Sequence, residues 1–189
     1  IGRDEWKRAI QDLKQAGKVR YWGISINDHQ PDSALEACRT GLIDTVQVIY
    51  NIFDQSPERN LYPLCQELNI GVLARVPLDE GSLTGTITPE TEFDPAEFRA
   101  WYFRGNHKQL VFDRVNSLVA DLAPAELHET LAETALRFCI SHPAVSTVIP
   151  GMRKIRNVEQ NMGVSEKGVL PDPVLAILRR HAWEKNFYS

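Results

Sequence analysis

The stretch STVIPGMRKIRNVEQN, residues 146–161, places a strand, a glycine turn and the start of a helix in direct succession. The β-branched run at its start breaks at Pro150-Gly151, and the residues that follow are predicted to be helical. The first turns of this helix carry Arg153, Lys154 and Arg156, although a helix N-terminus favours carboxylates. A phosphate bound to the free N–H groups would need such cations beside it. The stretch therefore indicates an anion site of the phosphate type; a solvated basic first turn is the alternative.

The overall composition excludes several classes of protein. The 189 residues are enough for one ordinary core, and 43% hydrophobic with 24% charged residues is typical of a soluble globular protein. A net charge of −4 gives no general attraction to nucleic acid or to anionic membranes. No apolar run approaches the roughly 20 residues of a membrane span, and no secretory signal pattern is present. We therefore expect neither nucleic acid nor membrane as a partner.

The cysteines favour a reducing compartment. Cys38, Cys65 and Cys139 are odd in number, widely spaced and without a CxxC pair. This pattern is typical of reduced, buried thiols, and we expect a cytoplasmic protein. No Cys/His pair has the spacing of zinc ligands, so no metal site is expected.

The N-terminal residues have the pattern of a helix interior. The chain starts with Ile1 rather than Met, and the apolar residues of segment 1–19 recur at helical spacing up to Gly17. We expect a chain that begins inside such a pattern to be a piece of a longer protein.

Four apolar runs predict four strands. They are suited to buried strands and cover residues 19–25, 43–51, 69–78 and 145–151. Helical patterns alternate with them, at residues 31–41, 56–69, 107–123, 124–143, 156–163 and 171–189. Residues 79–105 are predicted to be a long loop with little regular structure. This alternation predicts an α/β fold with parallel strands and right-handed crossovers.

Two details of the helical segments are specific enough to test. Ser56 is predicted to be the N-cap of its helix, with Pro57 at the first helical position. The last helix is predicted to be amphipathic and to contain Trp183, Phe187 and Tyr188.

Parallel α/β folds bind ligands beyond the C-terminal ends of their strands. The residues at that rim are Ser25, Asn27, Gln47, Tyr50, Asn51, Val76, Leu78, Gly151 and Arg153. A buried amide at Gln47 would cost about 1–3 kcal/mol unless it is hydrogen-bonded. Gln47 therefore either faces a ligand or bonds to a neighbouring strand, and Ser25 is either a ligand contact or a turn residue.

Four segments resemble the second half of an aldo-keto reductase. They are GKVRYWGIS, DTVQVIYN, GVLARVPLDEGSLTG and HPAVSTVIPGMRKIRNVEQN, which together span most of the chain. The resemblance implies a TIM (β/α)8 barrel that reduces carbonyls with NADPH, less often NADH. This chain would supply the fifth to eighth strands with their helices, as a single C-terminal half-barrel domain with a helical tail.

The resemblance also assigns roles to residues. Ser25 and Gln47 match the pair that holds the nicotinamide carboxamide, and Arg75 stands where many relatives stack a tyrosine on the nicotinamide. The family often has Asn directly after the serine, whereas here Ile26 intervenes before Asn27. The segment 79–85 resembles the loop that folds over the pyrophosphate. The turn after the last strand matches the loop that surrounds the 2′-phosphate of the cofactor. The helix that follows this turn matches the segment that contacts the adenine. The full set of candidate cofactor-binding residues is Ser25, Asn27, Gln47, Arg75, Val76, Pro77, Leu78, Gly81, Ser82, Leu83, Gly85, Pro150, Gly151, Met152, Arg153, Asn157, Gln160 and Asn161.

No residue of this chain is assigned a catalytic role. The family reduces carbonyls with a tetrad of Asp, Tyr, Lys and His, which the resemblance places upstream of Ile1. Tyr50 is expected to line the rim or support the cofactor, and His29 to be a loop residue. The other histidines are expected to have surface or packing roles.

Two functions follow from these expectations. In the first, the chain is the cofactor-binding half of an NADP-dependent oxidoreductase with a small carbonyl substrate. In the second, it is a non-catalytic four-strand unit. An open parallel sheet exposes unpaired strand edges, so such a unit would form a homodimer or pair with its missing N-terminal half.

Overall fold

The chain forms a four-stranded parallel sheet in the computed structural model, which describes residues 4–188. The strands lie in chain order: β1 (Gly23–Ser25), β2 (Thr45–Ile49), β3 (Gly71–Arg75) and β4 (Val145–Ile149). All three neighbouring pairs are parallel, which confirms the predicted α/β alternation. The α-helices are α1 (Glu5–Gln15), α2 (Leu35–Cys38), α3 (Leu61–Glu67), α4 (Phe98–Tyr102), α5 (His107–Leu122), α6 (Leu131–Ile140), α7 (Ile155–Lys167) and α8 (Asp172–Arg179). Short 3-10 helices are η1 (Pro31–Ala34), η2 (Ser56–Glu58), η3 (Asp79–Thr84) and η4 (Ala123–Ala125).

One face of the sheet is covered and the other is partly open. Val46, Val48, Val72 and Ala74 are buried, because successive side chains of a strand point to opposite faces and these point to the core. Here α3 packs on β3 and α6 on β4. Of the alternate residues of β2 and β3, Ile49 is buried, and Thr45, Gln47, Gly71, Leu73 and Arg75 are only half-buried. The central strands are thus buried on one face, not on both as their apolar runs predicted.

The first predicted strand is wrong in extent and burial. Residues 19–25 yield only the three residues of β1, whose two ends are exposed, and Tyr21 is exposed before it. The short strand lies very close to its neighbour: a Cβ on Gly23 would lie 2.2 Å from the Thr45 hydroxyl. Glycine is therefore required at this position.

Two helix predictions are also corrected. Ser56 is not an N-cap; it starts η2, and its N–H and hydroxyl both donate to the Asp54 carboxylate. The last helix ends at Arg179, and residues 180–188 continue without helix. Its predicted aromatic residues therefore lie in a non-helical tail.

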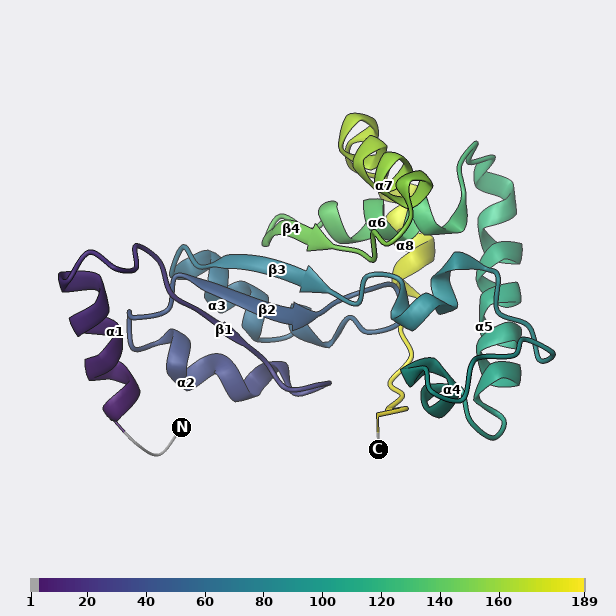
Figure 1. Cartoon of the computed structure of the whole chain (residues 1–189). Coiled ribbons are helices and arrows are strands. Elements are labelled where there is room, and N and C mark those ends of the chain that lie inside the picture. Colours follow the sequence, from purple (N-terminus) through teal and green to yellow (C-terminus); the bar gives the residue numbers. More distant parts are fainter. Residues whose placement is uncertain (1–3, 189) are drawn as a thin grey trace.

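The long insertion is more ordered than its composition predicted. It contains η3 and α4, and α5 follows directly. In Figure 1 these elements lie beyond the C-terminal ends of β2 and β3, and the yellow C-terminal tail runs between the strands and this insertion. No helix within residues 4–188 is long and apolar enough to cross a membrane.

Candidate functional site

Two polar side chains meet at the C-terminal edge of the sheet. Ser25 and Gln47 are register partners on β1 and β2, so their side chains share one face. The Gln47 Nε2 donates to the Ser25 hydroxyl at 3.3 Å, on the open side of the sheet. Both predicted carboxamide residues are thus brought together and remain accessible. The hydrogen bond to a neighbouring strand, which was the structural alternative for Gln47, is also present.

Arg75 has an internal role in this structure. Its guanidinium donates to the Asp28 carboxylate at 2.5 Å and to the Ile26 carbonyl at 3.1 Å. The pair connects the end of β3 to the loop after β1, where exposed Asn27 also lies. The guanidinium is therefore fixed beside the Ser25–Gln47 pair.

The loop after β3 has an unusual backbone. Val76, Asp79 and Glu80 have φ values of 53°, 48° and 56°, in the left-handed region that non-glycine residues rarely adopt. Such a value in a β-branched residue marks real strain, and strained backbone clusters at ligand-binding sites. Gly81 and Gly85, with φ of 109° and 72°, complete the turn. This is the segment predicted to cover the pyrophosphate.

Several candidate residues of this loop face the protein interior. Pro77, Ser82 and Leu83 are buried, and the Ser82 hydroxyl donates to the Asp79 carbonyl. Only their backbone groups can therefore contact a ligand. Leu78 is half-buried and packs against the core.

Asn51 organises the adjoining loop. Its side chain is fully buried, donates to the Val76 carbonyl at 3.0 Å and accepts from the N–H groups of Phe53 and Asp54. Tyr50 is also buried, with its hydroxyl donating to Glu58 at 2.5 Å. Burial, followed by the Glu58 charge, raises the pKa of Tyr50. Both follow β2 at the predicted rim, but neither side chain is exposed to a ligand, so Tyr50 makes no direct contact here and its supporting role stays a prediction.

The turn after β4 carries cations without partners. Arg153, Lys154 and Arg156 are exposed, and their side chains have no hydrogen bond or ion pair to any residue of 4–188. They lie at the start of α7, whose N-cap position is Lys154 and which has neither a side-chain cap nor an acidic residue in its first turn. An uncapped helix N-terminus with free cations is suited to an anion.

The other candidates of this region surround the same turn. The Asn161 side chain donates to the Gly151 carbonyl at 3.2 Å, which fastens the turn to α7. Met152 and Gln160 are exposed, whereas Pro150 and Asn157 are half-buried.

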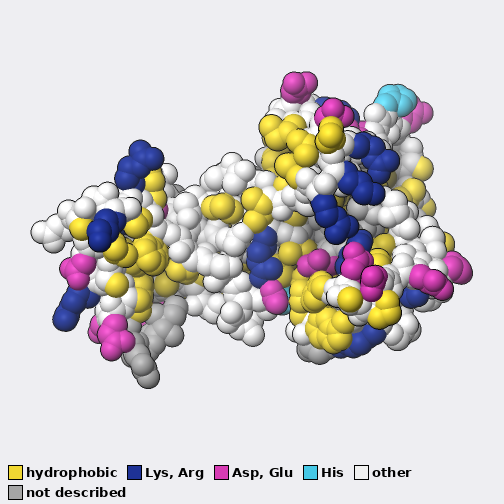
Figure 2. Space-filling model, in the orientation of Figure 1, with side chains coloured by type: hydrophobic (Ala, Val, Ile, Leu, Met, Phe, Trp, Pro, Cys, Tyr) yellow, Lys and Arg dark blue, Asp and Glu magenta, His cyan; other side chains and the backbone are white. Residues whose placement is uncertain are grey.

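A cavity of about 390 Å³ joins this turn to the insertion. It is lined by Glu80, Glu97, Phe98, Arg99, Gly151, Arg153 and Asn157. Its carboxylates already have partners: Glu97 pairs with Arg99 at 3.0 Å, and Glu80 accepts from the Tyr188 hydroxyl at 2.7 Å. Figure 2 shows Lys and Arg side chains facing acidic ones across a hollow between α7 and the insertion. Of the two arginines that line this cavity, Arg99 is paired with Glu97, and Arg153 has no polar partner among residues 4–188.

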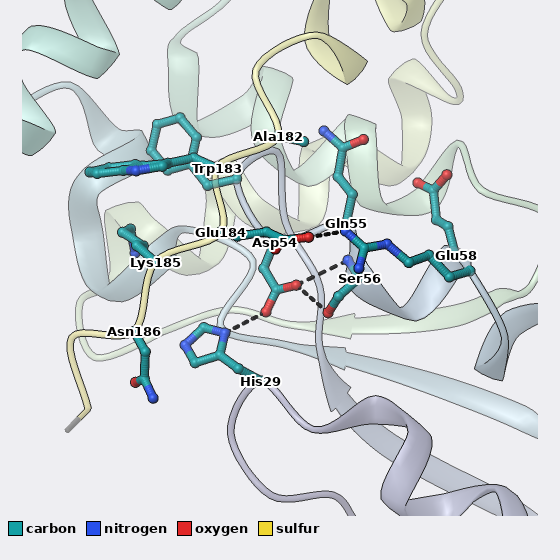
Figure 3. A pocket seen from close by; sticks show the side chains of 12 residues that line it. His29, Asp54, Gln55, Ser56, Glu58, Ala182, Trp183, Glu184, Lys185 and Asn186 are labelled. Atoms are coloured by element: carbon teal, nitrogen blue, oxygen red, sulfur yellow. Dashed lines mark hydrogen bonds and ion pairs between the residues drawn. The ribbon is translucent and has the colours of Figure 1, made fainter.

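A second and larger cavity was not predicted from the sequence. It measures about 750 Å³ and lies between the loop after β2 and the C-terminal tail. Figure 3 shows His29 directed at Asp54, and Asp54 bonded in turn to Ser56. Burial would raise the pKa of Asp54, but the bonds from His29 and Ser56 hold it below its ordinary value. The loop position predicted for His29 is confirmed, and its bond to Asp54 could not be read from the sequence.

Lys185 was not singled out by any sequence pattern. Its ammonium group is buried, donates to Asp79 at 2.7 Å and to the Tyr102 hydroxyl at 2.9 Å, and lies over three aromatic rings. Burial, followed by the Asp79 charge, raises the pKa of Tyr102. Through Asp79, Lys185 connects the C-terminal tail to the candidate pyrophosphate loop.

The remaining histidines have surface or packing roles, as expected. His107 stacks on Phe187 at 3.8 Å, His142 packs on Tyr62 at 4.7 Å, and buried His181 bonds to Asp121 at 3.1 Å. Burial lowers the pKa of both His142 and His181. His128 is exposed.

Comparison with known proteins places this geometry in a family. The model of the aldo/keto reductase family matches residues 3–182. An uncharacterized oxidoreductase of Bacillus subtilis, YqkF, is 29% identical over 94% of this chain and 55% of its own length. The NADH-specific methylglyoxal reductase of Escherichia coli is 28% identical over 81% of this chain and 46% of its own. The chain thus spans about half the length of these relatives.

Solved structures share the fold. The aldo-keto reductase AKR11C1 of Bacillus halodurans, in its holo form, superposes with a TM-score of 0.74 at 27% identity, covering 98% of this chain and 59% of its own. An aldo-keto reductase of Klebsiella pneumoniae in complex with NADPH superposes with a TM-score of 0.64 at 24% identity. The match covers 99% of this chain and 57% of the Klebsiella chain. Because the family model matches residues 3–182, nearly the whole chain, the chain belongs to the aldo/keto reductase family.

Proposed function

We propose that this chain is the cofactor-binding half of an NADP-dependent aldo-keto reductase. In that role it supplies the fifth to eighth strands of the barrel, and the acid–base tetrad lies outside it. The parent enzyme reduces a small aldehyde or ketone to an alcohol in the cytoplasm. The observation that carries the proposal is the turn after β4, where unpaired Arg153 lines a cavity shared with the loop after β3.

The residues of this chain bind and orient. Because Gln47 Nε2 donates to the Ser25 oxygen, the Ser25 hydroxyl proton is left to donate to a carboxamide oxygen. The loop 76–85 presents backbone groups rather than its buried side chains to the pyrophosphate. When bound, NADPH supplies the hydride, while this chain determines which atoms face the substrate.

The preference for NADP rests on charge. A 2′-phosphate is a dianion, and cationic donors without internal partners are the groups that favour it. Arg153 lines the cavity, and Lys154 with Arg156 flanks it at the uncapped start of α7. NAD lacks this phosphate, so the same cations would give it little advantage.

Titration of the 189-residue chain with NADPH and NADH, followed by tryptophan fluorescence, tests the proposal. We expect Arg153→Ala to weaken NADPH binding about 10-fold or more, since a charge-assisted hydrogen bond is lost, and to change NADH binding less than about 2-fold. Arg20→Ala, at an exposed arginine before β1, is the matched control and should leave both affinities unchanged. Equal affinities in wild type and Arg153→Ala would refute the phosphate assignment.

The exposed sheet edges support a second candidate, a non-catalytic half-barrel. Among residues 4–188, β1 and β4 each pair with one neighbour only, and the strand face opposite the core stays partly open. Unpaired edges of this kind recruit further strands. The chain would then form a homodimer or pair with a separate N-terminal half. Sedimentation over a wide concentration range decides: a dimer is expected, and a monomer at the highest concentration contradicts this function.

A further inference from the structure

The C-terminal tail fastens three loops at the C-terminal edge of the sheet. The N–H of Trp183 donates to the Phe53 carbonyl at 2.8 Å, after β2. The ring of Tyr188 contacts that of His29 at 5.4 Å, after β1. Lys185 reaches Asp79 at 2.7 Å, after β3. Figure 3 shows the tail, from Ala182 to Asn186, running beside Asp54 and His29.

Lys185 makes the central contact of this tail. Its side chain is 5% exposed and that of Asp79 is 4% exposed, so the pair is removed from water. The rings of Tyr102, Trp183 and Phe187 lie 5.5, 5.4 and 4.7 Å from the ammonium nitrogen. A buried carboxylate that loses its cation is strongly disfavoured, so Asp79 could not keep this position without Lys185.

Asp79 lies in the strained part of the loop. It and Glu80 have φ of 48° and 56°, and both side chains are held from the tail, Asp79 by Lys185 and Glu80 by the Tyr188 hydroxyl. Left-handed backbone at non-glycine residues persists only where the surroundings enforce it. The two bonds from the tail are therefore placed to enforce it.

We propose that Lys185 is a positioning residue: through Asp79 it holds the loop 76–85 in the conformation that binds the cofactor pyrophosphate. The inference rests on the proposed function for its consequence, but the loop conformation can be measured without any cofactor. A purely packing role for Lys185 predicts general destabilisation instead of a local change at this loop.

Hydrogen exchange of the cofactor-free 189-residue chain separates these roles. In Lys185→Met we expect the amides of residues 76–85 to exchange about 10-fold faster or more, while those of β2 keep wild-type rates, because the opening is local. Lys185→Arg should restore most of the protection, and adding Asp79→Asn to Lys185→Met should restore part of it by removing the unpaired charge. Lys7→Met, at an exposed ion-paired lysine of α1, is the matched control.

Unchanged exchange at 76–85, or an equal increase in β2, overturns the positioning role. If Lys185→Met does not fold, Tyr188→Phe is used instead, which removes only the bond to Glu80. The exchange rates of residues 76–85 should then rise by a smaller factor, again with unchanged rates in β2. NADPH titration of the folded variant then tests the consequence, with an expected affinity loss of about 10-fold. A wild-type chain that binds no NADPH refutes the proposed function, and the exchange result still decides what Lys185 does.

Discussion

Two cations at the C-terminal edge of the sheet differ in every physical respect. Lys185 is buried, bonded to Asp79 and Tyr102 and surrounded by aromatic rings. Arg153 is exposed at the start of α7 and has no polar partner among residues 4–188. Both lie next to the loop after β3, Arg153 through the cavity it shares with Glu80.

The difference separates residues that shape a site from residues that can bind a ligand. A buried, fully paired charge has no capacity left for a ligand, and its removal leaves a partner uncompensated. An exposed, unpaired cation contributes almost nothing to stability and keeps its hydrogen-bond donors for an anion. Loss of Lys185 should therefore affect the stability of the loop after β3 first, and loss of Arg153 should affect binding only.

The largest expected effect is on the buried pair. Lys185→Met should lower the free energy of opening of loop 76–85 by about 3–5 kcal/mol, because Asp79 is left charged and buried. Hydrogen exchange of the loop amides measures it, and urea denaturation followed by circular dichroism should show little change in the unfolding of the whole chain. A loss below about 1 kcal/mol would remove the contrast with Arg153, since it would show that the pair is not buried in solution.

A second buried carboxylate tests whether breaking a buried ion pair is also destabilising away from the candidate site. Glu129 is 3% exposed, pairs with Arg137 at 2.9 Å and accepts from the Thr134 hydroxyl at 2.9 Å. We expect Glu129→Ala to cost about 2–4 kcal/mol of unfolding free energy, and the exposed Glu166→Ala to cost less than about 0.5 kcal/mol. Similar losses for both variants would contradict the assignment of Glu129 to the interior.

A pH dependence is expected at the start of α6. The bond from Lys167, followed by the Thr130 N–H, lowers the pKa of Glu133 from 4.5 to about 2. The folded state therefore binds this proton less readily than the unfolded chain, so the stabilisation is complete above pH 4.5 and is lost as pH falls towards 2. It should amount to about 1–2 kcal/mol, as for a capping box with a charged hydrogen bond.

The measurement is the difference in unfolding free energy between wild type and Glu133→Gln, taken at several pH values. The difference should shrink in acid and be constant at neutral pH. A difference that does not change with pH would show that the carboxylate charge is not the stabilising group.

The smallest expected effect on stability is at Arg153. Arg153→Ala should change the free energy of unfolding by less than about 0.5 kcal/mol, since an exposed unpaired side chain makes no stabilising contact. The same denaturation experiment applies. A loss comparable to that of Glu129→Ala would mean that Arg153 has a structural partner, and the anion site would lose its main support.

The strand order and the meeting of Ser25 with Gln47 were predictable, because parallel strands in alternation with helices bring their C-terminal ends to one edge. The glycine turn and basic helix start after β4 were likewise visible in residues 146–161. Both features follow from short stretches of sequence: the strand ends predict which residues meet at the edge, and residues 146–161 predict the turn and the helix start.

The contacts of the tail were not predictable. Lys185 and Asp79 are separated by 106 positions, and no local pattern relates them. The apolar spacing of residues 171–189 predicted one helix, yet the chain leaves the helix after Arg179 because Trp183 and Phe187 pack on more distant rings. The extent of β1 was overestimated for a similar reason, since an apolar run does not show whether a strand lies at an edge.

The separation of Lys185 from Asp79 has a consequence for the order of folding. Closing a loop of 106 residues is entropically costly, so this contact should form late, after the nearer strands have paired. The sheet and its helices can therefore assemble before the edge that faces the ligand acquires its shape. On warming, the same edge should be the first part of the molecule to open.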